Sequence, residues 1–425
     1  MTKLISVLGS ASAPRRFKPS KSFSAHALVM VSSVLDKRGD FFATASIDRT
    51  CRIWSTSDSS SSAPFAADAG LHSGPSTPVA RLEGHANELF SVAFNPPACD
   101  RVITASGDST AAVWDVRSSR LLVQLRGHSR EVLRACFAPT PSSGSALTVL
   151  AATASLDGSA RVWDVSTGTS LLGALVHADG VSHVEFSADS SLVLTATLAG
   201  DGAVRLWDVR SGECARAFRR TADGEDREVV TRAAMSGDGR TIAAATGDAV
   251  VLWDTRTDAR PLSSVEMLAE VQDVAFLERA DGGGAGVVAA DASGALVFIK
   301  DAFNTNTQAK TQAKTKTTEA ERSRNEEVGE EDNCKRIRAH TSAVTQIACS
   351  ASGKYVFTAS ADKTAKVWDF SHDDAAWGEK GPLVQVLDGH PDEVWSVSVD
   401  YEARTVVTGC KNGFCRVWTA DFTQQ

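Results

Sequence analysis

Histidine, threonine and aspartate recur together along this chain, and these side chains can form a base, a nucleophile and an orienting acid. Six histidines each precede a threonine by 18 to 25 residues, and a tryptophan follows that threonine by ten residues. Between threonine and tryptophan stands an aspartate, or once an asparagine. The six sets are His26, Thr44, Asp48, Trp54; His85, Thr104, Asp108, Trp114; His128, Thr153, Asp157, Trp163; His177, Thr197, Asp201, Trp207; His340, Thr358, Asp362, Trp368; and His390, Thr408, Asn412, Trp418.

The repetition itself argues against catalysis. Eight times, a polar turn is followed by an alternating apolar run that ends on tryptophan or, once, on Ile299, and such a run predicts a strand. Near-constant spacing of these runs predicts a modular array whose units cannot bury their apolar faces alone. Because the threonines lie within the strands and not on exposed turns, we expect these side chains to have a structural role and the protein not to be an enzyme.

Two further features repeat in register with these sets. Trp-Asp pairs end five of the runs, and glycine directly precedes His85, His128 and His390. From about Ser20 to Trp418 the chain therefore resembles the WD40 repeat family. The resemblance implies an all-β propeller, in which each repeat supplies the outer strand of one blade and the three inner strands of the next.

The resemblance also implies that each set forms a hydrogen-bonded tetrad within one blade, running from the Trp indole N–H to Thr, from Thr to His and from His to Asp. Physical chemistry supports this arrangement. Each polar atom would cost about 1–3 kcal/mol if it were buried unpaired, and the other members can satisfy it.

Counting repeats predicts eight blades; seven blades with one aberrant repeat outside the ring is the alternative. The last repeat lacks an outer strand, which Ser20 to His26 could supply, closing the ring without a covalent bond. We expect residues 1–19 and 421–425 to be tails and residues 20–420 to form the propeller. Insertions at about 55–78 and 302–333 are polar or low in complexity, and we expect them to be disordered.

The fifth and sixth repeats depart from the pattern. Ala243 and Ala289 replace the threonine, Gly247 and Ser293 replace the aspartate, and neither repeat has its histidine. We expect apolar packing alone to hold these two blades, which would make them the weakest sector.

Composition excludes several classes of function. The net charge of −8 repels nucleic acid and anionic lipid, and no apolar stretch approaches the roughly 20 residues of a membrane helix. No phosphate loop or metal-ligand motif occurs, so we expect no cofactor and no metal. Eight cysteines without a Cys-x-x-Cys pair indicate buried thiols and a cytoplasmic location, with the nucleus as the alternative.

In the WD40 family the top face of the propeller binds peptides, through residues near the tetrad histidine and just before the tetrad aspartate. We therefore expect a monomeric propeller that serves as a scaffold or adaptor within a multiprotein complex, and that binds segments carrying apolar and basic residues. The positions carried over are Val31, Ile47, Glu88, Phe90, Glu131, Leu133, Leu156, Glu393 and Trp395.

A second function class stays open. Arg117, Arg210 and Arg256 each end a Trp-Asp-x-Arg box, which is similar to that of substrate receptors of cullin-4 RING ubiquitin ligases. The alternative is that each arginine simply pairs with the aspartate of its own box.

Overall fold

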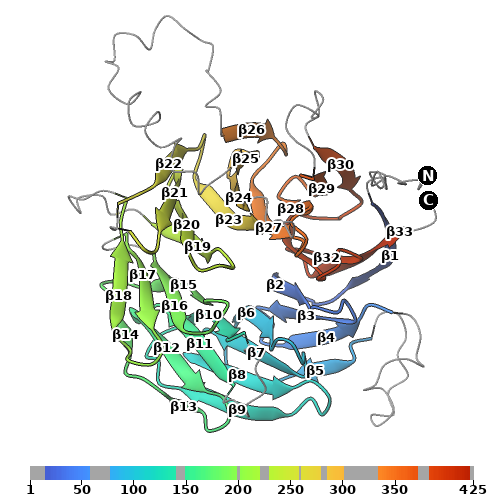
Figure 1. Ribbon diagram of the computed structural model, residues 1–425. Coiled ribbons are helices and arrows are strands. Elements are labelled where there is room, and N and C mark those ends of the chain that lie inside the picture. Colours follow the sequence, from blue (N-terminus) through green and yellow to red (C-terminus); the bar gives the residue numbers. More distant parts are fainter. Residues whose placement is uncertain are drawn as a thin grey trace, which may run out of the picture.

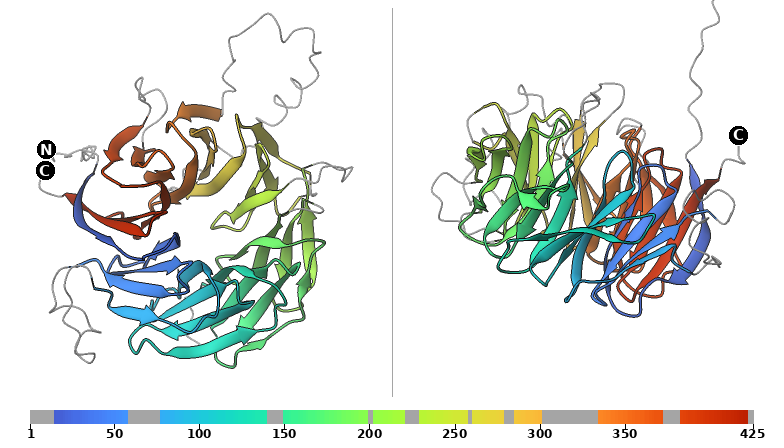
Figure 2. Two further views of the ribbon diagram at one scale, coloured as in Figure 1. Left: turned by 180° about the vertical axis from the view of Figure 1, so that it is seen from behind. Right: turned by 90° about the horizontal axis from the view of Figure 1, so that it is seen from below.

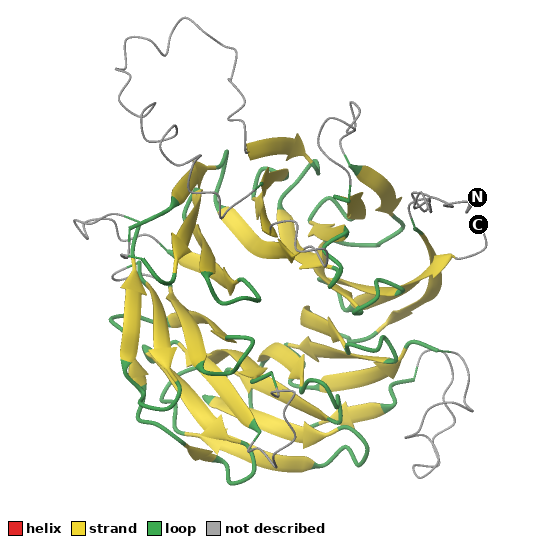
Figure 3. Ribbon diagram, viewed as in Figure 1, coloured by secondary structure: helices red, strands yellow, loops and turns green. Residues whose placement is uncertain are grey.

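The computed structural model describes residues 15–57, 77–139, 149–198, 202–220, 229–257, 260–278, 285–300, 334–371 and 382–421. These residues form antiparallel sheets arranged around a ring, and none of them lies in a helix (Figures 1 and 3). The described residues consequently offer no helix that could cross a membrane. Most of the insertions predicted at 55–78 and 302–333, and Asp201 of the fourth set, lie outside the described residues.

Each sheet is one blade, numbered along the chain and given from its innermost strand outward. Blade one contains β2 (Met30–Leu35), β3 (Phe41–Ser46), β4 (Cys51–Ser55) and β5 (Ala80–Leu82); blade two contains β6 (Leu89–Phe94), β7 (Arg101–Ser106), β8 (Thr110–Asp115) and β9 (Leu121–Arg126). Blade three contains β10 (Val132–Phe137), β11 (Leu150–Ser155), β12 (Ser159–Asp164) and the short strands β13 (Thr169–Ser170) and β14 (Leu175–Val176); blade four contains β15 (Val181–Phe186), β16 (Leu192–Thr197), β17 (Val204–Asp208) and β18 (Cys214–Phe218).

The second half of the ring repeats this order. Blade five contains β19 (Val230–Met235), β20 (Thr241–Thr246), β21 (Ala249–Asp254) and β22 (Ser263–Glu266); blade six contains β23 (Val271–Glu278), β24 (Ala285–Asp291), β25 (Ala295–Ile299) and β26 (Cys334–Arg338). Blade seven contains β27 (Val344–Cys349), β28 (Tyr355–Ser360), β29 (Ala365–Asp369) and β30 (Leu383–Leu387); blade eight contains β31 (Val394–Val399), β32 (Thr405–Cys410), β33 (Phe414–Asp421) and β1 (Arg16–Ser24).

The innermost strands close the ring. Each of these strands contacts the innermost strand of the next blade, and β31 of blade eight returns to β2 of blade one (Figure 2). The described residues therefore form one ring of eight blades, as the repeat count predicts, and the alternative of seven blades with an excluded repeat is wrong.

The two ends of the chain meet in blade eight. Strand β1 pairs antiparallel with β33, which supplies the outer strand that the last repeat lacks. This strand begins at Arg16, so residues 16–19, which we expected to belong to a tail, are part of the sheet. The reason is Phe17, whose buried ring packs edge-on against Phe357 of blade seven at 5.5 Å between centroids. The backbone N–H and carbonyl of Phe17 also bond to the side-chain amide of Gln385, both at 2.7 Å.

Apolar side chains fill the space between neighbouring blades. The middle strands β3, β20, β28 and β32 are buried along their whole length, because a neighbouring blade covers each face. Ile53 and Leu82 of blade one, for example, belong to the same apolar cluster as Leu89 and Trp114 of blade two. Every blade thus completes the core of the next.

Polar side chains on the innermost strands join one blade to the next. Ser182, Thr231 and Thr345 each donate a hydroxyl hydrogen bond to a backbone carbonyl of the following blade, at 2.7–2.9 Å. Other side chains accept from backbone N–H groups of the following blade, among them Gln346 from Val397 at 3.0 Å. These bonds fix the angular spacing of the blades near the ring axis.

One such contact corrects our expectation for blades five and six. Asp273 on β23 is buried, pairs with Arg232 of blade five at 3.1 Å and accepts from the backbone N–H of Ile347 in blade seven at 2.8 Å. The prediction that apolar packing alone holds this sector is therefore wrong. A buried carboxylate connects three blades where the tetrads are missing.

The closure makes a testable prediction. Replacing Phe17 with alanine should lower the free energy of unfolding by about 3–5 kcal/mol, because it leaves a cavity between blades seven and eight. Lys18→Ala, on the exposed side of the same strand, serves as the control and should change stability little. Chemical denaturation of both variants measures the difference, and equal stability of the two would contradict the role of β1.

Candidate functional site

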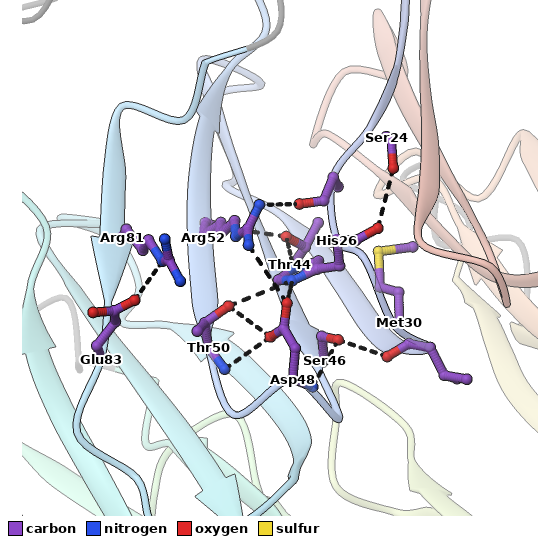
Figure 4. A network of polar contacts seen from close by, with 12 residues as sticks. Ser24, His26, Met30, Thr44, Ser46, Asp48, Thr50, Arg52, Arg81 and Glu83 are labelled. Carbon is purple, nitrogen blue, oxygen red and sulfur yellow. Dashed lines mark hydrogen bonds and ion pairs between the residues drawn. The ribbon is translucent and has the colours of Figure 1, made fainter.

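The tetrad of blade one shows how the repeated side chains are used, and Figure 4 shows three of its members, His26, Thr44 and Asp48. His26 contacts Asp48 through Nδ1 and Thr44 through Nε2, both at 2.8 Å. The indole N–H of Trp54 donates to the same Thr44 hydroxyl at 3.0 Å. One placement of the hydrogens gives every polar side-chain atom of the tetrad a partner. In it, His26 Nδ1–H donates to Asp48, and the Thr44 hydroxyl donates to His26 Nε2 while accepting from Trp54.

Charge within this tetrad is fixed by burial and hydrogen bonding. Burial lowers the pKa of His26 and outweighs the opposing effect of Asp48, so the imidazole is neutral near pH 7. Burial alone would raise the pKa of Asp48, but hydrogen bonds from Thr50 and His26 outweigh burial and lower it. The pair is thus a neutral imidazole bonded to a carboxylate.

Three other blades make the same contacts. His85, His128 and His340 bond their aspartates, Asp108, Asp157 and Asp362, at 2.8–2.9 Å and their threonines, Thr104, Thr153 and Thr358, at 2.7–2.8 Å. Trp114, Trp163 and Trp368 donate to those threonines at 2.8–2.9 Å. Each threonine is fully buried and its hydroxyl is already engaged, so these sets offer no accessible nucleophile.

Blade four departs from the predicted tetrad. Trp207 donates to Thr195 at 2.9 Å and not to Thr197, whose hydroxyl instead donates to the carbonyl of Ala203 at 3.4 Å. His177 Nδ1 contacts the guanidinium of Arg205 at 2.9 Å. The hairpin between β16 and β17 is two residues longer than in the other blades that carry the tetrad residues, so Thr195 pairs with Arg205 as Thr44 pairs with Arg52. Counting ten residues back from tryptophan therefore selects the wrong threonine.

Blade eight keeps three members of its tetrad. His390 Nε2 contacts Thr408 at 2.8 Å, and Trp418 donates to Thr408 at 3.0 Å. Asn412 Oδ1 accepts from the backbone N–H of Phe414 at 3.1 Å, and among the described residues Asn412 makes no hydrogen bond to the histidine. His390 Nδ1 is buried without a hydrogen-bond partner in the described part of the chain.

The predicted binding positions lie on four adjacent blades. The second residue of each innermost strand is half-buried in these blades: Val31 in β2, Phe90 in β6, Leu133 in β10 and Trp395 in β31. Strands β31, β2, β6 and β10 contact one another in that order around the ring. Ile47 and Leu156 are half-buried in the turns before the tetrad aspartates, and Glu88, Glu131 and Glu393 precede the inner strands. We call this set, on blades eight, one, two and three, the top-face arc.

One member of the arc is already engaged within the chain. The indole N–H of Trp395 donates to Glu393 at 3.0 Å, and Lys411 pairs with Glu393 at 3.4 Å while lying 5.3 Å from the Trp395 ring centroid. Sequence reasoning missed Lys411. It directly precedes Asn412, the same place that Ile47 holds in blade one, so the repeat alignment contained the signal.

The arginines of the Trp-Asp-x-Arg boxes differ in their contacts. Arg256 forms a two-pronged pair with Asp254, at 3.1 Å from Nε and 2.9 Å from Nη2. Arg210 donates its backbone N–H to Asp208 at 2.9 Å, and Arg117 follows β8 in the equivalent turn of blade two. For Arg256 the structure therefore shows pairing with the aspartate of its own box.

No group of histidine, cysteine, aspartate or glutamate within the described ranges could hold a metal ion. All eight cysteines fall in those ranges and are free thiols. Burial raises the pKa of the Cys136 and Cys349 thiols to about 12, which suits them to a packing role.

Comparison with known proteins identifies the repeats. The family model for the WD domain, G-beta repeat (WD40), matches residues 17–55, 76–115, 119–164, 170–208, 332–369 and 381–419, more than half of the chain. The chain belongs to the WD40 family. The two repeats outside these matches build blades five and six, which lack the tetrad residues.

Individual relatives match only parts of this WD40 protein. It is 29% identical over 89 residues to eukaryotic translation initiation factor 3 subunit I of Xenopus laevis, a segment covering 21% of this chain and 25% of that protein. It is 35% identical over 88 residues to dynein assembly factor with WD repeat domains 1 of Danio rerio, covering 21% and 17%. The matched segments thus span a quarter or less of these relatives.

A solved structure covers the whole ring. The computationally designed Ika8 protein superposes with a TM-score of 0.68 at 20% identity, over 94% of this chain and 99% of the designed chain. At this identity the likeness shows the fold alone.

Blade four supplies a prediction about the tetrad threonines. Thr195→Val should lower the free energy of unfolding by about 1–3 kcal/mol, because Trp207 then buries an indole N–H without an acceptor. Thr197→Val, its matched control two residues away, should lower the free energy of unfolding by clearly less. Thermal and urea denaturation compare the two, and a larger loss in Thr197→Val would restore the original assignment.

The incomplete tetrad of blade eight can be repaired. Asn412→Asp should stabilise the protein by about 1–3 kcal/mol near neutral pH, because the new carboxylate accepts from His390 Nδ1. Asn412→Ala is the control, since it removes the amide without adding an acceptor, and it should not stabilise. Equal stabilities of the two variants would contradict this account.

The same site predicts how stability depends on pH. Burial, together with the nearby Arg416, lowers the pKa of His390 to about 4 from 6.5. Because the unfolded chain binds this proton first, the free energy of unfolding should fall as the pH drops from 6.5 to about 4. In Asn412→Asp the carboxylate favours the charged imidazole, so denaturation across this range should show a smaller loss.

Proposed function

We propose that this WD40 propeller is a non-catalytic scaffold that binds segments of other proteins at the top-face arc. The observation that carries the proposal is the contiguity of half-buried Val31, Phe90, Leu133 and Trp395 on adjacent inner strands. Accessible apolar and aromatic groups gathered at one place are typical of protein interfaces. The hydroxyls of the tetrad threonines in blades one, two, three and seven, by contrast, are buried and engaged.

The charges around the arc define the partner. Glu88 is exposed and Glu131 is half-buried, with Arg130 3.7 Å from Glu131, whereas Lys411 already pairs with Glu393. Because Arg130 and Lys411 pair with Glu131 and Glu393, the acidic end of the arc lies over blade two, at Glu88. A segment that places apolar side chains against Phe90 and Leu133 and a lysine or arginine near Glu88 fits this surface best.

The relatives support a role in an assembly. One is named as a subunit of a translation initiation factor and another as a dynein assembly factor. We infer that this chain acts as a single propeller within a hetero-complex in the cytoplasm, with the nucleus as the second location. The ubiquitin-ligase alternative has less support, because Arg256 is held by Asp254.

Affinity purification tests the top-face arc. Phe90→Ala combined with Trp395→Ala should reduce capture of co-purifying proteins by at least about tenfold, since buried aromatic anchors contribute 2 kcal/mol or more each. The control is Leu121→Ala with Leu122→Ala, which removes two exposed leucines from the outer strand β9. Quantitative mass spectrometry compares both variants with the unaltered chain.

Two results would contradict the proposal. One is undiminished capture by the Phe90/Trp395 variant with its melting temperature preserved. The other is equal loss in the β9 control, which would place the docking surface on the rim of the propeller.

A further inference from the structure

Five ionisable side chains gather on the inner ring, away from the top-face arc. They come from four successive innermost strands: Arg134 on β10, His183 and Glu185 on β15, Arg232 on β19 and Asp273 on β23. These strands contact one another in that order. The cluster spans blades three to six and serves neither a tetrad nor the proposed function.

The two acidic side chains of the cluster differ in how many contacts hold them. Asp273, 2% exposed, is held by Arg232, by its own strand through the N–H of Val274 and by Ile347 of blade seven. Glu185 has 42% of its side-chain surface accessible and lies 3.7 Å from Nε2 of His183, beyond hydrogen-bond distance. Asp273 is thus a fixed structural anion, whereas Glu185 is free to respond to a ligand.

The basic members have spare hydrogen-bonding capacity. His183 is 3% exposed, and its Nε2 has no hydrogen-bond partner among the described residues. Arg232 uses Nε for Asp273 and is 26% exposed. Arg134 forms no hydrogen bond or ion pair with the described residues, and burial, together with repulsion from Arg232, lowers its pKa to about 10.

Glu185 adjusts the charge of the cluster. Although 42% of its side-chain surface is accessible, desolvation by the surrounding strands raises the pKa of Glu185 to about 7, against the opposing effect of Arg134 and Arg232. Burial and the same two arginines keep His183 neutral by lowering its pKa. When Glu185 is protonated, two guanidiniums face a single carboxylate, and the cluster carries a net positive charge.

We propose that Arg134, His183 and Arg232 form a binding site on the inner ring for a phosphate group. The three side chains come from adjacent innermost strands of blades three, four and five. Several donors suit a tetrahedral oxyanion, whereas one guanidinium alone satisfies a planar carboxylate. Arg134 and His183 Nε2, which have no hydrogen-bond partner among the described residues, each gain one. The phosphate can be free in solution or carried by a phosphorylated side chain, since both present the same oxygens.

The cluster also dictates how binding depends on pH. A bound dianion repels ionised Glu185, so binding and protonation of Glu185 favour each other. Because the probe also takes up a proton in this range, the effect of Glu185 is measured against a variant that lacks the carboxyl: as the pH rises through about 7, the unaltered chain should lose affinity relative to that variant. Cys136 on β10 also faces Glu185, but its thiol has a pKa of about 12 and stays neutral throughout this range.

Calorimetric titration of the full chain tests the site with inorganic phosphate, pyrophosphate and phosphoserine as probes. Arg134→Met should weaken binding at least about tenfold, the loss expected for hydrogen bonds to a charged group. Arg130→Met is the control, because Arg130 is an exposed arginine of the same repeat outside the cluster, and it should bind as the unaltered chain does. Arg134→Met should keep its melting temperature, since it removes a cation that faces Arg232.

A second variant tests the pH dependence. Glu185→Gln should bind the probes more tightly than the unaltered chain at about pH 8, and the two affinities should approach each other at about pH 6, because the titration of the probe is common to both proteins. Tighter binding of phosphoserine than of inorganic phosphate would assign the site to a phosphorylated protein, and the reverse order to the free ion. Unchanged affinity in Arg134→Met, or no binding of any probe at pH 6, would overturn the proposal.

Discussion

The pairing of β1 with β33 is the contact on which the rest of the molecule depends. A blade buries its two apolar faces only when it has a neighbour on each side, and in an open array the first and last blades would each expose one face. Strand β1 forms the outer strand of blade eight, and Phe17 on this strand packs against Phe357 of blade seven. Closure gives blades one and eight the second neighbour that each would lack in an open array.

Two kinds of polar contact act within this closed frame. The tetrads fix the shape of individual blades, because the histidine links the turn that holds the aspartate to the threonine of the middle strand. The inner-ring hydrogen bonds fix each blade relative to the next. Blades five and six lack the first kind and rely on the second, through Asp273. The ring therefore tolerates the loss of a tetrad where a neighbour supplies a buried partner.

Much of the fold could be predicted from the sequence, because it follows from repetition. The period and the Trp-Asp pairs predict the strands, the blade number and the closure, and all three agree with the structure. The predictions that were wrong concern features that depend on the register of a strand or on contacts between blades. Thr195 and Thr197 lie two residues apart in one strand, and only the length of the hairpin selects between them. Asp273 and Arg232 lie in different repeats, so no pattern within one repeat reveals their pairing.

Hydrogen–deuterium exchange along β33 measures the closure directly. In the intact chain, the amide hydrogens of β33 that bond to β1 should exchange as slowly as those of the middle strand β32. Once residues 1–24 are removed, these amide hydrogens of β33 should lose their protection. Rapid exchange of those β33 amides in the intact chain would show that the ring is open, and would contradict the claim that β1 closes it.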